Sequence, residues 1–189
     1  MILTPKRRRR GTILPLVNLS LVAICGFVAL AVDIGLIAVA KTQCQNAADD
    51  AAMAGCRSLD GTASQNLGDL NTSGSATYNA QQTALANKVL TDTLDASKII
   101  LQFGSWHYDT TNQVFVAQIP PVSPDTYTLC QVTVSYDVNT TFAPAFQALP
   151  GSTINPVFTV SATAQAAHRP RDFAIILDFS GSMNNESDL

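Results

Sequence analysis

Three oxygen-bearing side chains near the end of the sequence have the spacing of a cation-binding loop, namely Asp178, Ser180 and Ser182. They directly follow the apolar run Phe173–Leu177, which is typical of a strand buried on both faces. A hard divalent cation such as Mg²⁺ prefers oxygen ligands at about 2.0–2.1 Å in an octahedron. One carboxylate and two hydroxyls on a tight loop can supply part of that set. The alternative is a serine–glycine turn that holds no metal.

A second group of side chains with catalytic potential is Trp106, His107, Tyr108 and Asp109. We expect them in a strand that runs into a hairpin turn, where aromatic side chains pack and the Asp-Thr-Thr-Asn sequence turns. Nothing in the sequence pairs with His107 as in a catalytic triad or a metal cluster, and His168 is expected in a linker. We therefore interpret this group as structural and expect neither enzymatic activity nor a small-molecule substrate.

The element that must position the rest of the chain is the apolar run Ile13–Ala40, which follows the basic run Lys6–Arg10. Roughly 20 helical residues cross the hydrocarbon core of a bilayer, about 30 Å thick. A helix satisfies its own backbone hydrogen bonds in lipid, so we predict a single transmembrane helix over residues 11–40. The positive flank predicts a cytoplasmic N-terminus with the remainder outside.

A cleaved signal peptide is an alternative, because Ala38–Ala40 has the small-x-small form of a cleavage site. The apolar part of a signal peptide usually runs about 7–15 residues, and this one is longer, which favours a retained anchor. A buried helix of a soluble protein would leave the arginine run without a purpose. Sequencing the mature N-terminus separates the first two alternatives.

Asp33 is a carboxylate within the apolar run. It comes about 30 Å of helix after Ile13, which favours a position near the outer headgroup layer. The alternative is a polar contact with a partner helix, for which Ala31 and Gly35 form a small-xxx-small pair that permits close approach.

Charge is distributed unevenly along the chain, whose formal net charge is −3. From Asp33 onward six basic residues face fourteen acidic ones, a formal charge of −8 that argues against a nucleic-acid partner. The arginine run beside the span is expected to set topology and to contact anionic lipid.

Four cysteines are present, and Cys25 falls in the predicted span. In an oxidising compartment Cys44, Cys56 and Cys130 can form disulfides. Cys44 and Cys56 would lie about 18 Å apart along one helix and cannot pair. A Cys56–Cys130 bridge stays open, although free buried thiols are the default expectation. No cysteine spacing resembles a metal site.

After the span, an alanine-rich helix is expected to continue over residues 41–60. The residues Cys44, Ala48, Ala52 and Cys56 form a row of small side chains that suits close packing against another helix or the domain that follows. The alternative is a rigid stalk without a specific partner.

The remaining chain is expected to form an exported α+β domain over residues 76–168, with two helices packed on a small antiparallel sheet. A linker rich in Gly, Ser, Thr and Asn covers 61–75. The expected elements are a helix over Ala76–Leu94, strands over Ile99–Phe103, Val114–Ile119, Leu129–Val138 and Val157–Ala164, and a short helix or buried loop over Thr141–Pro150.

The segments Arg9–Gly11, Ala31–Gly35 and Cys44–Ala52, with the apolar run between them, resemble the N-terminal region of TadE/TadG-like pilus-assembly proteins. The resemblance covers about Arg9–Leu59. It implies a single-pass protein of the bacterial inner membrane that serves the tight-adherence (Flp) pilus system, with lipid and other pilus-assembly or envelope proteins as partners. Relatives cut by prepilin peptidase carry a glutamate shortly after the processing site. No acidic residue lies near Gly11, so the TadG-like branch fits better.

The segment Phe173–Met183 resembles the first strand and metal-site loop of a von Willebrand factor type A domain. The resemblance implies that Asp178, Ser180 and Ser182 are part of a metal-ion-dependent adhesion site (MIDAS) for Mg²⁺. The later strands and ligands of that family are absent before Leu189. We therefore expect residues 169–189 to be the poorly ordered start of a truncated domain, with no cofactor in this chain and Mg²⁺ only in a full-length form.

Together these expectations divide the chain into a cytoplasmic basic segment (1–10), a transmembrane helix (11–40), a stalk helix (41–60), a linker (61–75), an exported domain (76–168) and a truncated type A segment (169–189). The predicted function is a membrane-anchored envelope protein that helps to assemble or anchor surface pili and so promotes adhesion. The alternative is an Mg²⁺-dependent protein-binding adhesion module, complete only in a longer form.

Overall fold

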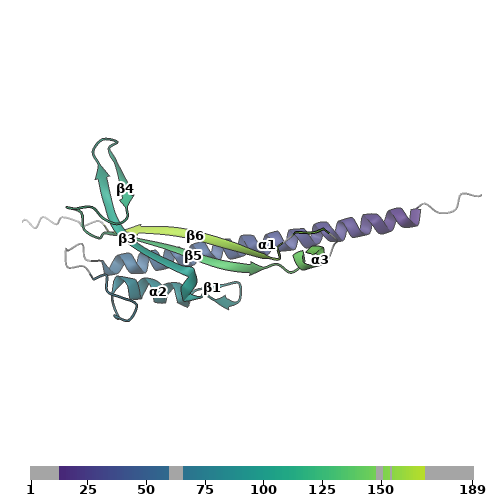
Figure 1. Cartoon of the computed structure of the whole chain (residues 1–189), viewed down its shortest axis with the longest axis horizontal. Coiled ribbons are helices and arrows are strands. Elements are labelled where there is room, and N and C mark those ends of the chain that lie inside the picture. The colour runs from purple at the N-terminus through teal and green to yellow at the C-terminus, as the bar shows by residue number, and fades with distance from the viewer. Residues whose placement is uncertain (1–12, 60–65, 148–150, 154, 169–189) are drawn as a thin grey trace, which may run out of the picture.

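A single long helix, α1 (Ile13–Ser58), runs the length of the molecule, and most of the remaining elements lie along its second half (Figure 1). The structure is a computed structural model, and it describes residues 13–59, 66–147, 151–153 and 155–168. At 1.5 Å per residue the 46 residues of α1 extend about 69 Å. The predicted transmembrane and stalk helices are therefore one continuous helix.

In the first part of α1, from Ile13 to Val28, no residue is buried, and the side chains are apolar apart from Asn18 and Ser20. Its large side chains are strongly exposed, for example Ile13 at 75%, Leu14 at 73% and Phe27 at 73%. The first buried residue is Ala29, so contact with the domain begins there. Among the described residues, α1 is the one helix long and apolar enough to cross a membrane.

The second part of α1 packs closely against the domain. Its buried residues beyond the apolar part are all small: Ala40, Cys44, Ala47, Ala48, Ala51, Ala52, Gly55 and Cys56. Small side chains let another helix or a sheet approach the backbone closely. This row contacts α2 (Ala76–Ala86) and the sheet, which confirms packing against the following domain over an unpartnered stalk.

Helix α2 is shorter than the sequence predicts. It begins after Ser75, whose hydroxyl accepts the backbone N–H of Tyr78 at 3.2 Å, as an N-cap does. It ends at Ala86, and the expected continuation to Leu94 is wrong. In its place β1 (Lys88–Val89) and β2 (Asp92–Thr93) form a small hairpin, followed by the short helix η1 (Ala96–Lys98).

The hairpin replaces the last helical turns for a physical reason. Its sequence, Lys-Val-Leu-Thr-Asp-Thr, is rich in β-branched residues, which favour extended backbone. Leu90 takes a left-handed conformation with φ of 57°, and its N–H donates to the side chain of Gln43 on α1. A contact with a distant helix therefore fixes the turn.

The four predicted strands are confirmed, and they form one antiparallel sheet in the order β4-β3-β5-β6. Their bounds are Ile99–Asp109 for β3, Val114–Gln118 for β4, Leu129–Asn139 for β5 and Val157–Ala167 for β6. The first half of β3 pairs with β5 and the second half with β4, so the β3–β4 hairpin projects away from the rest of the sheet (Figure 1).

Gly104 marks the point where β3 changes partners. A Cβ at this position would lie 2.3 Å from the carbonyl oxygen of Gln118. Only a residue without a side chain permits that approach of the two backbones.

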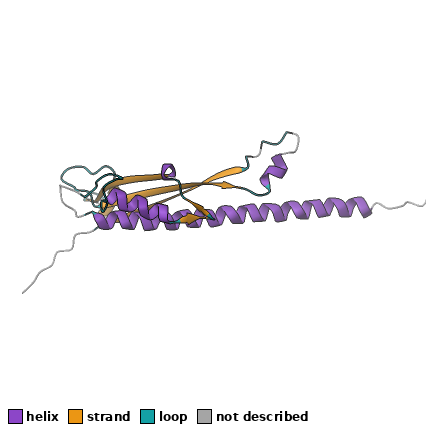
Figure 2. Cartoon of the chain, turned by 90° about the horizontal axis from the view of Figure 1, so that it is seen from below, coloured by secondary structure: helices purple, strands orange, loops and turns teal. Residues whose placement is uncertain are grey.

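The sheet covers α1 with one face and presents the other to solvent (Figure 2). The inward residues of β5 and β6 are apolar, including Val132, Val134, Val160 and Ala162. The outward face carries uncharged polar pairs between strands: Gln102–Gln131, Gln131–Gln165, Thr133–Thr163 and Ser135–Ser161. This alternation produces the predicted α+β fold of helices packed on an antiparallel sheet.

The segment between β5 and β6 contains the short helix α3 (Ala143–Gln147), which confirms the helical alternative predicted there. In both views α3 lies beside α1, close to its bare part (Figures 1 and 2).

Candidate functional site

The junction between the apolar part of α1 and the domain is built around Asp33. This carboxylate is buried, with an exposed fraction of 7%, although its neighbours along the helix are exposed. An ionised group withdrawn from water must be paired or hydrogen-bonded. The partners of Asp33 come from a segment more than a hundred residues later in the chain.

Asp33 accepts the backbone N–H groups that precede and begin α3. Its Oδ1 accepts from Thr141 at 2.9 Å, and its Oδ2 accepts from Ala143 at 3.0 Å. The N–H of Phe142 is shared between the two oxygens at 3.3 and 3.2 Å. The first N–H groups of a helix have no partner within the helix, so a carboxylate at this position is a cap supplied by another helix.

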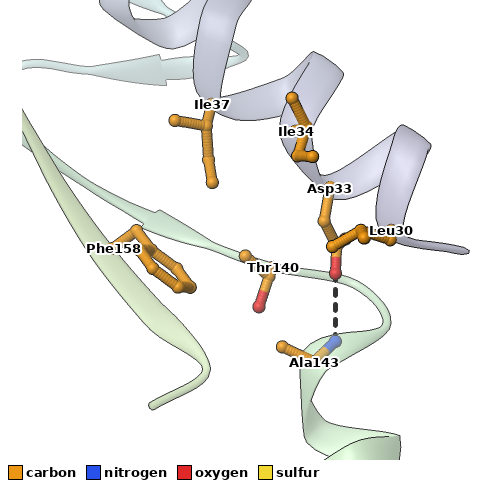
Figure 3. A pocket seen from close by; sticks show the side chains of 7 residues that line it. All are labelled: Leu30, Asp33, Ile34, Ile37, Thr140, Ala143 and Phe158. Carbon is orange, nitrogen blue, oxygen red and sulfur yellow. Dashed lines mark hydrogen bonds between the residues drawn. The ribbon is translucent and has the colours of Figure 1, made fainter. Parts of the chain in front are cut away.

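A cavity of about 240 Å³ lies next to this cap, between α1 and the end of the sheet. Figure 3 shows that Leu30, Ile34 and Ile37 from α1 face Phe158 from β6, with Thr140 and Ala143 below them. The polar atoms that border the cavity are engaged, because Thr140 Oγ1 donates to the carbonyl of Pro156 at 2.7 Å and Asp33 holds its three amides. The remaining wall is apolar.

The structure therefore gives Asp33 a role that the sequence did not suggest. Its partners are three backbone amides of the same chain, which precede and begin α3. The small residues Ala31 and Gly35 are exposed, and a Cβ at Gly35 would meet nothing within 4 Å. The signal in the sequence was the isolated carboxylate in an apolar run; its partner could not be read because backbone amides carry no sequence signature.

The predicted metal ligands Asp178, Ser180 and Ser182 lie outside the described residues, as does the whole segment 169–189. Within the part of the chain that the structure describes, no group of three or more His, Cys, Asp or Glu side chains could hold a metal ion.

His107 has a partner that the sequence did not indicate. Its Nδ1 lies 2.6 Å from Asp125 Oδ2, and Ser105 Oγ donates to the same oxygen at 3.4 Å. The serine thus bonds to the carboxylate and makes no contact with the imidazole that would activate it as a nucleophile. The cluster fastens the loop before β5 to the middle of β3.

Asp109 serves the turn for which it was predicted. Its carboxylate accepts the N–H groups of Thr111 at 2.8 Å and Asn112 at 3.3 Å, and the side chain of Asn112 at 2.7 Å. The hydrogen bond from the Asn112 side chain and those from the two amides lower the pKa of Asp109. These contacts close the β3–β4 hairpin.

The cysteines are free thiols in the structure. Cys130 on β5 lies under α1 close to Gly55 and Cys56, and burial raises the pKa of its thiol to about 12. Burial also raises the pKa values of Cys44 and Cys56. Thiols in such surroundings react slowly, because the thiolate is the nucleophile.

Comparison with known proteins gives one finding, which falls on α1 and the residues just beyond it. No curated protein and no solved structure matches the chain. Residues 11–65, which include the whole of α1 with Asp33 and the row of small residues, match the Tad family of TadE/G-like Flp pilus-assembly proteins.

Proposed function

We propose that this protein is a single-pass membrane protein that takes part in the assembly or anchoring of Flp pili. The first part of α1 crosses the bilayer, and the second part holds the α+β domain at the membrane surface. The match of residues 11–65 to pilus-assembly proteins supports the process, and the properties of α1 support the location.

The observation that carries the proposal is the exposed apolar surface of α1. Between Ile13 and Val32 no residue is charged, and large apolar side chains point in every direction. Transfer of one such side chain out of water is favourable by about 1.5–3 kcal/mol. A helix that is apolar all round belongs either in a protein core or in a membrane, and nothing in the described structure covers this one.

The orientation follows from charge. The basic run Lys6–Arg10 precedes the span, and the next basic residue is Lys41. Basic flanks remain on the cytoplasmic side, so the α+β domain faces the periplasm or the cell exterior. The net negative charge of the domain, which disfavours nucleic-acid binding, fits a location outside the cytoplasm.

The expected partners are lipid and other envelope proteins of the pilus system. Ala31 and Gly35 offer a smooth strip on α1 that faces neither the sheet nor α3. A strip of small residues lets a second transmembrane helix approach closely. Assembly would then bring together helices in the membrane and domains above it.

Cell fractionation tests the anchor and its direction. The full chain should remain with the membrane after an alkaline wash, and a reporter enzyme active only outside the cytoplasm should be active when fused after Ala167. In a matched chain with the five basic residues Lys6–Arg10 replaced by serine, that activity should fall. Recovery of the intact chain in the soluble fraction would refute the anchor.

Deletion of the gene tests the process. Loss of surface pili and of adherence, restored by the full chain and not by a chain without residues 13–32, is the expected result. Normal piliation in the deletion strain would refute a role in assembly while leaving the anchor in place.

The sequence of residues 173–183 supports a second candidate, a Mg²⁺-dependent adhesion module in a longer form of the protein. Asp178, Ser180 and Ser182 would provide part of the ligand set. Adhesion that requires Mg²⁺ and is lost in Asp178→Ala would support this function; adhesion unaffected by chelation would reject it.

A further inference from the structure

The bare part of α1 is shorter than a bilayer. From Ile13 to Val28, before contact with the domain begins at Ala29, the helix extends about 24 Å. The hydrocarbon core is about 30 Å thick, and a helix that fills it from Ile13 reaches Val32. The last turn of the span, residues 29–32, therefore lies at the same level as the first contacts with the domain.

The part of the domain found at that level exposes large apolar side chains. Phe142 before α3 is 39% exposed, Val157 at the start of β6 is 37% exposed and Phe158 is 44% exposed. The chain carries no Asp, Glu, Lys or Arg from Val138 to Ala167, although charged residues make up 13% of the protein. An absence of charge over such a length lowers the cost of burying this part of the domain in lipid.

Backbone amides in this region already have hydrogen-bond partners within the protein, as a medium with little water requires. The three amides at the start of α3 would each need a hydrogen-bond partner in the interface, and Asp33 supplies it to Thr141, Phe142 and Ala143. At the end of the sheet, the amide and the hydroxyl of Thr140 both donate to the carbonyl of Pro156.

The apolar surface is continuous with the span. The cavity beside Asp33 is walled by Leu30, Ile34 and Ile37 of α1 on one side and by Phe158 on the other (Figure 3). Lipid in contact with the outer turns of the span would meet this opening and the aromatic ring behind it without crossing a polar rim.

We propose that the α3 end of the domain is seated in the bilayer interface, with Phe142, Val157 and Phe158 among the headgroups and upper acyl chains. This inference rests on the proposed anchor. It adds that the domain touches the membrane. The tip, formed by residues 139–143 and 155–158, enters the leaflet on the domain's side to a depth of about 5–10 Å.

Depth-dependent fluorescence quenching tests directly whether the tip is seated in the interface (called the seat below). The chain suits this method because it has a single tryptophan, Trp106. In a Trp106→Phe background, tryptophan is placed by Phe142→Trp or Phe158→Trp in the tip and by Val22→Trp in the span. Val114→Trp in β4, a position 48% exposed at the opposite end of the domain, is the matched control. Each full chain is reconstituted into phosphatidylcholine vesicles that carry bromine either near the ester carbonyl or near the end of the acyl chain.

The tip variants should be quenched about twofold more strongly by the shallow bromine than by the deep one. Val22→Trp should show the reverse order, and Val114→Trp should be quenched by neither lipid. Circular dichroism checks that every variant keeps the fold.

The outcomes separate the inference from the anchor. Quenching of Val22→Trp without quenching of either tip variant would overturn the seat and leave the anchor intact. Absence of quenching for Val22→Trp would overturn the anchor and the seat together. Blue-shifted but unquenched emission from the tip variants would show that protein covers the patch, a second copy included, and would also overturn the seat.

Discussion

At the scale of single residues, one carboxylate connects α1 to the segment between β5 and β6. Asp33 lies on the first element and holds the start of α3 through three backbone amides. Hydrogen bonds to a charged group contribute about 1.5–3 kcal/mol when both partners are withdrawn from water. The contact fixes where the tip of the sheet lies along α1.

Replacement of this carboxylate should loosen the tip and leave the rest of the domain ordered. In Asp33→Ala the amides of Thr141, Phe142 and Ala143 should exchange with deuterium about 10–100-fold faster, as loss of about 1.5–3 kcal/mol requires. Asp50→Ala, an exposed position on the same helix, should leave their exchange unchanged. Equal protection in Asp33→Ala and the parent chain would refute the cap.

The buried thiols should resist alkylation in the folded chain. Burial raises the pKa of Cys130 to about 12, so almost no thiolate is present at neutral pH. We expect iodoacetamide to modify Cys130 rapidly only after denaturation, as followed by mass mapping of the labelled peptides. Rapid labelling of Cys130 in chains that keep their native circular dichroism would show that β5 does not lie under α1 as described.

Tyr136 should ionise at a higher pH than an ordinary tyrosine, and its ionisation should destabilise the fold. Its hydroxyl donates to Asp92 Oδ2 at 2.6 Å, and this bond, with some burial and the charge of Asp92, raises the pKa of Tyr136 to about 12 from 10.0. A folded-state value above the unfolded one means that the contribution to stability is complete below pH 10. It is lost as pH rises from about 10 to 12.

Absorbance titration of tyrosinate measures this shift. The tyrosine component with the highest pKa should disappear in Tyr136→Phe. In Asp92→Asn its pKa should move toward 10. A titration of Asp92→Asn that coincides with that of the parent chain would exclude the hydrogen bond as the cause.

At the scale of elements, the packing of α1 depends on the absence of side-chain bulk. A Cβ on Gly55 would lie 2.7 Å from Cys130 Sγ and 3.0 Å from Ala80 Cβ, so α1, α2 and β5 meet there without spare room. Gly55→Ala should destabilise the domain by about 1–3 kcal/mol, because overpacking outweighs the gain in helix propensity.

Chemical denaturation in detergent checks this value against two companions. Gly35→Ala, where a Cβ meets nothing within 4 Å, should be neutral. Cys130→Ala combined with Gly55→Ala should recover part of the loss, because the nearest clashing atom is removed. A neutral Gly55→Ala would show that the helices lie farther apart than described.

The elements could be predicted from the sequence to the extent that their patterns are local. Alternating residues such as Val132, Val134 and Tyr136 identified β5, and the long apolar run without charge identified the first part of α1. The helix over Ala76–Leu94 was predicted too long because the turn at Leu90 depends on Gln43 of α1. A contact between such distant segments cannot be predicted from local propensity.

The candidate site was only half predictable for a related reason. An aspartate within an apolar helix stands out in any sequence, and Asp33 lies near the end of the exposed apolar part of α1. Its partners are main-chain amides of Thr141 to Ala143, which no residue type announces. The pairing of His107 with Asp125 was missed likewise, because a loop had to fold back onto β3.

At the scale of the whole molecule, the protein has two ends of different character. The α3 end adjoins the apolar part of α1 and exposes the large apolar side chains of Phe142, Val157 and Phe158. The opposite end carries the exposed Asp69 and Arg57 and the projecting β3–β4 hairpin, and it lies farthest from the apolar part of α1 (Figure 1). Under the proposed anchor, a partner in the membrane would meet the α3 end, and a partner outside the membrane would meet the opposite end.

The unbroken course of α1 has a mechanical consequence. No break in the helix separates Val32 from Ser58, so we expect the domain and the apolar part of α1 to tilt together as one rigid body. The stretch from Asp33 to Ser58 measures about 38 Å. Under the proposed anchor, this length sets how far the opposite end of the domain stands from the membrane.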